Sequence, residues 1–145
     1  MHQNKSGFTI IELLLVVSII TIVGTVFLPV SVDYMQRNDL NVAQTTYAQS
    51  VRRAQQISMS GEYDSQWGVI ATSGNIVIFK GSTYATRDTN YDENYGISSS
   101  IISSGQAEYD FAKITGAPSQ TGVVAFTNGN FQKTVSVNAE GIVNY

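Results

Sequence analysis

The stretch Gly7-Phe8-Thr9-Ile10-Ile11-Glu12-Leu13-Leu14-Leu15-Val16-Val17 opens an apolar run that continues to Val32. Residues 8–32 carry a single ionisable side chain, Glu12. About 20 apolar residues are enough to cross the hydrocarbon of a bilayer as a helix. The run is apolar on all sides, unlike the one-sided pattern of a helix that covers a small soluble core. We therefore expect residues 8–32 to form a membrane-spanning helix.

A removable secretory signal is the main alternative for this segment. Such a signal needs small residues around a cleavage point after its apolar core. Here the run continues through Pro29 and Val30, and the first alanine after it is Ala43. This pattern favours a helix that stays in the mature protein.

Glu12 is the unusual residue of the run. A carboxylate inside an apolar transmembrane helix is disfavoured by roughly 3 kcal/mol on insertion scales. Because Glu12 lies only four positions inside the run, it could reach the lipid headgroups. The alternative hypothesis is that a neighbouring subunit supplies a positive group that pairs with Glu12.

The sequence from Gly7 to Leu13, followed by the apolar run, resembles the N-terminal signal of type IV pilins and type II secretion pseudopilins. The resemblance implies that a prepilin peptidase cuts between Gly7 and Phe8 on the cytoplasmic side and then methylates Phe8. Residues 1–7 would be the leader peptide. It also implies that Glu12 pairs with the α-amine of Phe8 on an adjacent subunit. Pro29 stands where many pilins carry a helix-kinking proline.

Pro29 lacks a backbone N–H, and Gly24 nearby weakens the helix further, so we expect a kink in this region. The resemblance implies other pilin or pseudopilin subunits, the prepilin peptidase and the inner (cytoplasmic) membrane as partners. The chain would be a single-pass protein with its head outside the cytoplasm, and later part of a filament. An anchored module whose head binds DNA, as in competence systems, or a surface ligand is the alternative.

The residue pattern of segment 33–60 predicts an amphipathic continuation of the helix. Gly61 follows at the position expected for a helix C-cap, so we expect one helix from about Phe8 to Ser60. The apolar residues of the second half are spaced by three or four: Leu40, Ala43, Tyr47, Val51, Ala54 and Ile57.

Residues 61–145 predict a β head. The expected strands are residues 66–71 and 75–80 around a short turn, residues 122–126 and 131–137 around Asn128-Gly129, and residues 142–145. Residues 81–105 are polar and rich in serine, and we expect a long loop there, with 97–102 and 109–114 as further candidate strands. The fold class is therefore α+β, in which a long N-terminal helix packs on an antiparallel β-sheet head.

Three further segments resemble the GspH/FimT-like group of minor pilins and pseudopilins. They are Val51-Arg52-Arg53-Ala54-Gln55, Thr115-Gly116-Ala117-Pro118, and the run from Lys133 to Val143. This resemblance implies a minor subunit rather than the main building block of a filament.

The composition argues against several kinds of catalytic and binding site. The chain has no cysteine, and its one histidine, His2, belongs to the expected leader. Its net charge of −3 gives no basic field for nucleic-acid phosphates. We expect no enzyme activity and no cofactor.

Asp88-x-Asn90-x-Asp92 resembles the opening ligands of a calcium loop, but position six is Glu93 and position twelve is Ser99. A solvated loop is the preferred interpretation of this segment, with calcium as the alternative.

Overall fold

The computed structural model describes residues 7–145, except for the side chains of residues 26–30. The chain divides after Met35 into two units, and each is described by itself. The expected leader lies outside the described residues, apart from Gly7.

Helix α1 runs from Ile10 to Ser60, and Gly61 follows with a left-handed φ of 69°. The expected helix end is thus confirmed. In the first unit, the large apolar side chains between Phe8 and Val23 are exposed, from 47% at Val16 to 85% at Phe8. Among the residues whose side chains are described, no helix has the length and apolarity needed to cross a membrane.

The polar side chains inside this apolar stretch bond to their own helix. The Ser18 hydroxyl donates to the Leu14 carbonyl at 2.7 Å, and the Thr21 hydroxyl donates to the Val17 carbonyl at 2.8 Å. Such bonds satisfy the hydroxyl groups without an outside partner. The backbone is helical through Gly24, whereas the Pro29 side chain lies outside the described residues, so the kink stays a prediction.

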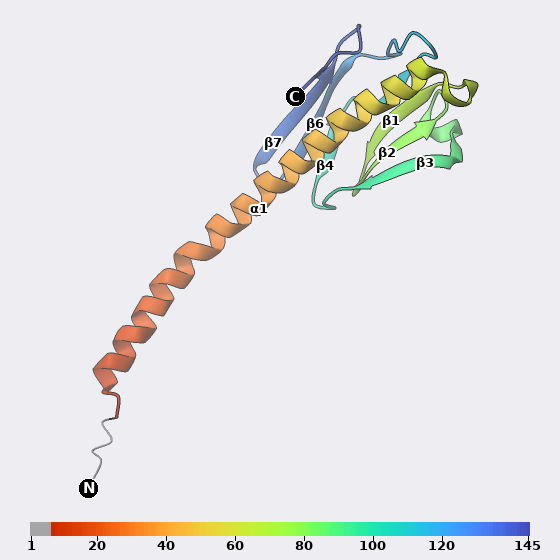
Figure 1. Ribbon diagram of the computed structural model, residues 1–145. Helices are drawn as coiled ribbons and strands as arrows, with labels where there is room; N and C mark the ends of the chain where they lie inside the picture. Colours follow the sequence, from red (N-terminus) through yellow and green to blue (C-terminus); the bar gives the residue numbers. More distant parts are fainter. Residues whose placement is uncertain (1–6) are drawn as a thin grey trace. The chain divides into compact units, whose positions relative to one another are not determined.

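The second unit consists of the rest of α1 and two four-stranded antiparallel sheets (Figure 1). The first sheet has the order β3-β2-β1-β5, and the second has the order β4-β6-β7-β8. The strands are β1 (Trp67–Thr72), β2 (Asn75–Lys80), β3 (Asp88–Gly96), β4 (Ile102–Gly105), β5 (Glu108–Phe111), β6 (Gly122–Asn128), β7 (Phe131–Val137) and β8 (Val143–Asn144). Two short 3₁₀ helices, η1 (Glu62–Asp64) and η2 (Tyr84–Thr86), flank the β1–β2 hairpin.

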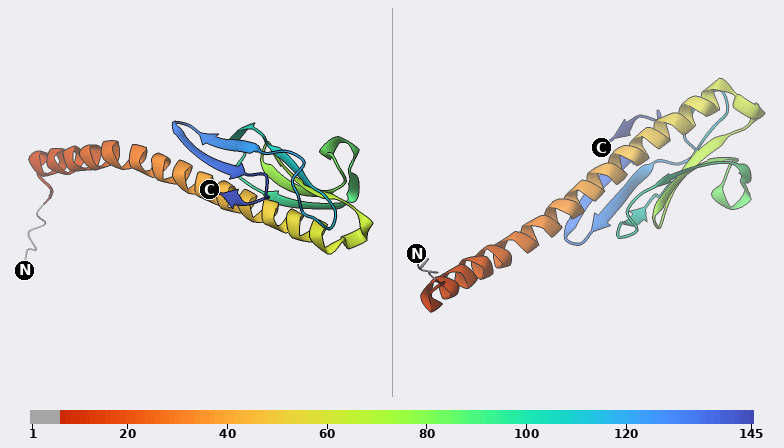
Figure 2. Two further views of the ribbon diagram at one scale, coloured as in Figure 1. Left: turned by 90° about the horizontal axis from the view of Figure 1, so that it is seen from above. Right: turned by 60° about the horizontal axis from the view of Figure 1, so that its bottom comes forward.

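Helix α1 lies along both sheets (Figures 1 and 2), and its apolar stripe is buried in the same core as residues of both. All six residues that the spacing predicted are in the core, together with Ala48. Tyr47 lies at the centre of this packing, with its ring edge-on to Phe126 of β6 at a centroid distance of 5.3 Å. The α+β fold class is therefore confirmed, with two sheets where the sequence indicated one.

The two hairpins form at the turns that the sequence predicted. Strands β1 and β2 pair from Trp67↔Lys80 to Thr72↔Asn75, and Gly74 closes the turn with φ 79°. Strands β6 and β7 pair from Gly122↔Val137 to Asn128↔Phe131. Gly129 adopts φ 57° in that turn, a conformation that glycine reaches without the strain of a Cβ.

The prediction of a long loop over residues 81–105 is wrong, because two strands lie within this range. Residues 88–96 form β3, the edge strand of the first sheet, paired with β2 through contacts such as Ile78↔Glu93. An edge strand tolerates polar and charged residues, so β3 has no apolar alternation to reveal it. Glu93 of this strand also forms an ion pair at 2.7 Å with Arg53 of α1, whose side chain stays 54% exposed. The candidate strands at 97–102 and 109–114 are displaced to 102–105 and 108–111.

Two core tyrosines differ in how their hydroxyl groups are satisfied. The Tyr47 hydroxyl donates to the Ala107 carbonyl at 2.9 Å. The Tyr109 hydroxyl is buried and has no hydrogen-bonding partner among the described residues. Burial raises the pKa of both phenols, that of Tyr109 to about 12. Both hydroxyls therefore stay protonated at neutral pH.

This difference predicts opposite effects of two isosteric variants. Tyr47→Phe should lower the free energy of unfolding by about 1 kcal/mol, because a buried hydrogen bond is lost. Tyr109→Phe should leave it unchanged or raise it, because the variant removes an unpaired buried hydroxyl. Urea unfolding of the full-length chain in detergent, followed by fluorescence of its single tryptophan, Trp67, measures both. Equal losses in the two variants would contradict this assignment.

Candidate functional site

Gly7 and Phe8 lie immediately before α1. A Cβ added at Gly7 would meet no atom within 4 Å, and Gly7 does not adopt a left-handed φ. The side chain of Phe8 is largely exposed. Nothing within the described chain therefore requires glycine at position 7.

Thr9 and Glu12 cap the start of α1 reciprocally. The Glu12 N–H donates to Thr9 Oγ1 at 3.3 Å, and the Thr9 N–H donates to Glu12 Oε2 at 3.5 Å. This arrangement is a capping box, which satisfies backbone N–H groups that have no partner inside the helix. The pattern Thr-x-x-Glu is the sequence signal for this capping box, in which Thr9 is a partner of Glu12 within the same chain. The second carboxylate oxygen, Oε1, has no hydrogen-bonding partner among the described residues.

Glu12 lies in an apolar groove of about 270 Å³ that is also lined by Phe8, Leu13 and Val16. These side chains belong to the exposed apolar surface of the first unit. Contiguous apolar surface of this kind marks an interaction site. The arrangement therefore presents one carboxylate at the edge of a surface suited to burial against other apolar groups.

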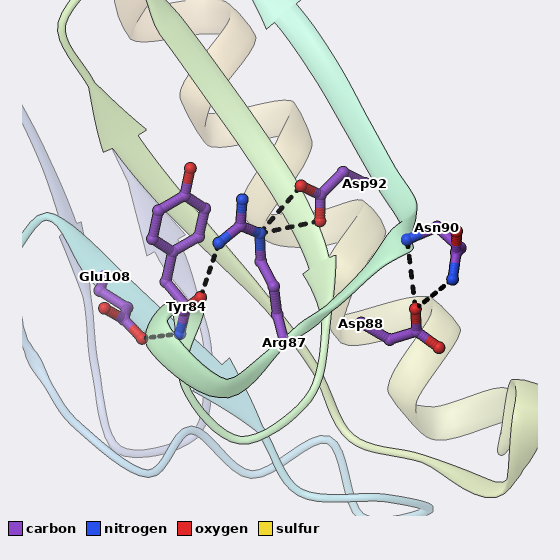
Figure 3. A network of polar contacts seen from close by, with 6 residues as sticks. All are labelled: Tyr84, Arg87, Asp88, Asn90, Asp92 and Glu108. Carbon is purple, nitrogen blue, oxygen red and sulfur yellow. Dashed lines mark hydrogen bonds and ion pairs between the residues drawn. The ribbon is translucent and has the colours of Figure 1, made fainter.

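The candidate calcium ligands belong to two separate sets of polar contacts, one around Arg87 and one between Asp88 and Asn90 (Figure 3). Arg87 Nε donates to both oxygens of Asp92, at 2.8 and 3.0 Å, and this pair is mostly buried. The hydrogen bond to Asp92 raises the pKa of Arg87. Asp88 Oδ1 accepts from the backbone N–H and the side-chain amide of Asn90.

The same network ties η2 to neighbouring strands. Arg87 also donates to the Tyr84 carbonyl at 2.8 Å and stacks over the Tyr84 ring, and the Tyr84 N–H donates to Glu108. Within the described residues, no group of three or more His, Cys, Asp or Glu side chains could hold a metal ion. The segment expected to be a solvated loop is thus part of a strand, and Asp92 already has a cationic partner.

Three segments that are distant in the sequence meet around Gln55 of α1. Gln55 Nε2 donates to the Gly116 carbonyl at 3.0 Å. A Cβ at Gly141 would lie 2.2 Å from Gln55 Nε2, so Gly141 lies directly against the end of this side chain. Gly116 and Gly141 both adopt left-handed φ angles, 65° and 78°. The segments 51–55, 115–118 and 133–143 therefore share one packing site.

A family model described as the prokaryotic N-terminal methylation motif matches residues 2–28. No curated protein and no solved structure matches the chain. The match supports a type IV prepilin-like precursor, a class with structural rather than enzymatic roles. In general terms, it implies processing by a prepilin peptidase, assembly with other pilins and a membrane-anchored pilus subunit.

The network at Asp92 predicts that calcium does not stabilise the protein. Adding millimolar calcium should leave the thermal unfolding midpoint of the full-length chain unchanged, because Arg87 already neutralises the Asp92 carboxylate. Asp92→Asn should lower the midpoint equally with and without calcium. A midpoint that rises with calcium in the parent chain, and does not rise in Asp92→Asn, would instead establish a cation site.

Proposed function

We propose that this chain is the precursor of a filament subunit of the type IV pilin class. The peptidase cuts between Gly7 and Phe8 and methylates Phe8. Residues 8–32 hold the subunit in the cytoplasmic membrane, with the head outside the cytoplasm, until it joins the filament. The observation that carries this proposal is the match to the methylation motif over residues 2–28.

The surroundings of Gly7 support the cleavage site. Because the chain itself has room for a side chain at this position, a requirement for glycine would come from the peptidase that binds the junction. The exposed Phe8 next to it is accessible to such an enzyme.

Charge pairing gives Glu12 its proposed role in assembly. The cut creates an α-amine on Phe8, which is the positive group that a carboxylate in an apolar helix needs. The capping box engages one Glu12 oxygen through a long bond and leaves Oε1 available to the amine of a neighbouring subunit. In an apolar environment such a pair is strong, because little water screens it.

Apolar helix packing supplies the rest of the filament core in this proposal. The Ser18 and Thr21 hydroxyls are satisfied within their own helix, so they can enter an apolar interface. Gly24 has open space around it, which permits close approach of a second helix. Head-to-tail contacts generate a filament when they do not close into a ring, and the proposal requires contacts of that open kind.

The finer proposal is a minor subunit of a type IV pilus or a type II secretion pseudopilus. Its support is the resemblance of segments 51–55, 115–118 and 133–143 to minor pilins, together with their packing around Gln55.

The cleavage proposal predicts that Gly7→Leu accumulates as full-length precursor in cells that contain the peptidase. Gly24→Ala is the matched control, because it also replaces a glycine with open surroundings in the same segment. We expect it to mature normally. Mass spectrometry of the native N-terminus measures both, with methyl-Phe8 expected in the parent chain. Normal maturation of Gly7→Leu would overturn the cleavage site.

Three variants separate the charge of Glu12 from its capping role. Glu12→Gln keeps a capping side chain but removes the charge, Glu12→Leu removes both, and Thr9→Ala breaks the capping box but keeps the charge. Charge pairing predicts that Glu12→Gln and Glu12→Leu both lose filament incorporation by about tenfold or more, since a buried charge pair broken on one side loses several kcal/mol. Thr9→Ala should retain most of it.

Incorporation is measured as the fraction of mature subunit in sheared filaments, normalised to the fraction in membranes. If Glu12→Gln assembles like the parent chain while Thr9→Ala does not, Glu12 acts through capping and the charge-pairing role is wrong.

A further inference from the structure

A second groove lies in the head, between α1 and β7. It has a volume of about 360 Å³ and is lined by Arg37, Leu40 and Asn41 of α1 and by residues 130–133 of the β6–β7 turn and β7. Figures 1 and 2 show this turn beside α1, and a Cβ added at Gly129 would lie 2.7 Å from Gln36 Oε1. We call it the β7 groove.

The polar side chains of the β7 groove are rich in hydrogen-bond donors. Five of its seven lining residues carry N–H donors, and none of the seven is a carboxylate: the five are Arg37, Asn41, Asn130, Gln132 and Lys133. No ion pair links Arg37 or Lys133 to any described acidic residue, and the three amides bond to no described residue. A cluster of unpaired donors with two positive charges favours an anion.

Arg37 is positioned for an oxyanion in particular. Its guanidinium carbon lies 4.1 Å from the centroid of the Phe131 ring. Stacking on an aromatic ring orients the guanidinium plane and leaves the N–H groups along its edge free. Those N–H groups match two oxygens of one phosphate or carboxylate. Leu40 and Phe131 add apolar surface beside this charge.

The position of the β7 groove in the chain indicates the source of the anion. Arg37 follows the end of the apolar run at Val32 by only five residues, a reach of at most about 18 Å in any conformation. A chain anchored through residues 8–32 therefore keeps this groove close to the lipid headgroups. Asp33 and Asp39 are neighbours in the sequence, but neither lines the groove.

We propose that the β7 groove binds the phosphate of an anionic lipid headgroup while the subunit is anchored in the membrane. Arg37 holds two phosphate oxygens, Lys133 supplies the second positive charge, and the amides bond to the remaining oxygens. Extraction into a filament then requires release of this lipid. The inference rests on the proposed membrane anchor, whereas the groove lies entirely within the head.

The acetylation rate of Lys133 measures whether the β7 groove is occupied. The full-length chain is reconstituted into vesicles of phosphatidylcholine alone or with added phosphatidylglycerol, and flotation with the neutral vesicles is scored first. Lysine acetylation rates are then determined by mass spectrometry, with Lys113, which pairs with Asp64, as the internal reference. Phosphatidylglycerol should slow the acetylation of Lys133 about fivefold relative to Lys113, which corresponds to one basic residue held at an anionic surface. High salt should remove this protection.

Two variants test the groove itself. Arg37→Gln should abolish the protection of Lys133. Arg53→Gln removes the same charge from α1 outside the groove, and it should leave the protection intact. Equal Lys133 rates in the two kinds of vesicle, or unchanged protection in Arg37→Gln, would overturn the proposal.

Other outcomes identify a different occupant. Protection by inorganic phosphate in neutral vesicles would indicate a free phosphate site in place of a lipid site. Protection in neutral vesicles that increases with the protein-to-lipid ratio would identify a second copy of the chain. A chain that does not float with neutral vesicles lacks the proposed anchor, and the lipid as occupant is overturned with it. Flotation together with equal Lys133 rates overturns the groove proposal alone.

Discussion

Burial of one helical stripe against two sheets is the interaction on which the head depends. The two sheets share no strand ladder, so hydrogen bonding alone does not hold them together. The stripe of α1 from Leu40 to Ile57 packs with apolar residues of both sheets in a single core. Tyr47 joins the parts most directly, because its ring contacts β6 while its hydroxyl binds the connection between β4 and β5. Each sheet depends on α1 to cover an apolar face that would otherwise meet water.

The elements that the sequence predicted are those whose signal is local. The stripe of α1 repeats every three or four residues, and the hairpins are marked by glycine between apolar runs. Strand β3 gave no such signal, because it is a polar edge strand and its pairing with the rest of the chain is long-range. Glu93 pairs with Arg53, 40 residues away in the sequence. A pairing of this kind has no periodicity, so the strand was interpreted as a loop.

The difference between local and long-range signals also decides which parts of the candidate site the sequence could predict. Gly7, Phe8 and Glu12 were identifiable because the motif is contiguous, and its geometry depends on residues within a few positions of one another. The packing around Gln55 was not derivable, since Gly116 and Gly141 reach it from separate parts of the chain. The sequence showed three short segments, and only the fold shows that they are neighbours.

In the proposed filament, Glu12 is the position that sets the register of the packed helices. Apolar surfaces lose little free energy when they slide along one another, because burial is non-directional. The hydroxyl groups of Ser18 and Thr21 add no direction either, since they bond within their own helix. The Glu12 carboxylate differs, because one of its oxygens has no partner among the described residues and its electrostatic gain depends steeply on the distance to a positive group. In the proposed filament, the amine created by the cut at Phe8 pairs with that oxygen at one axial offset, and this pairing selects a single arrangement among many of similar apolar contact.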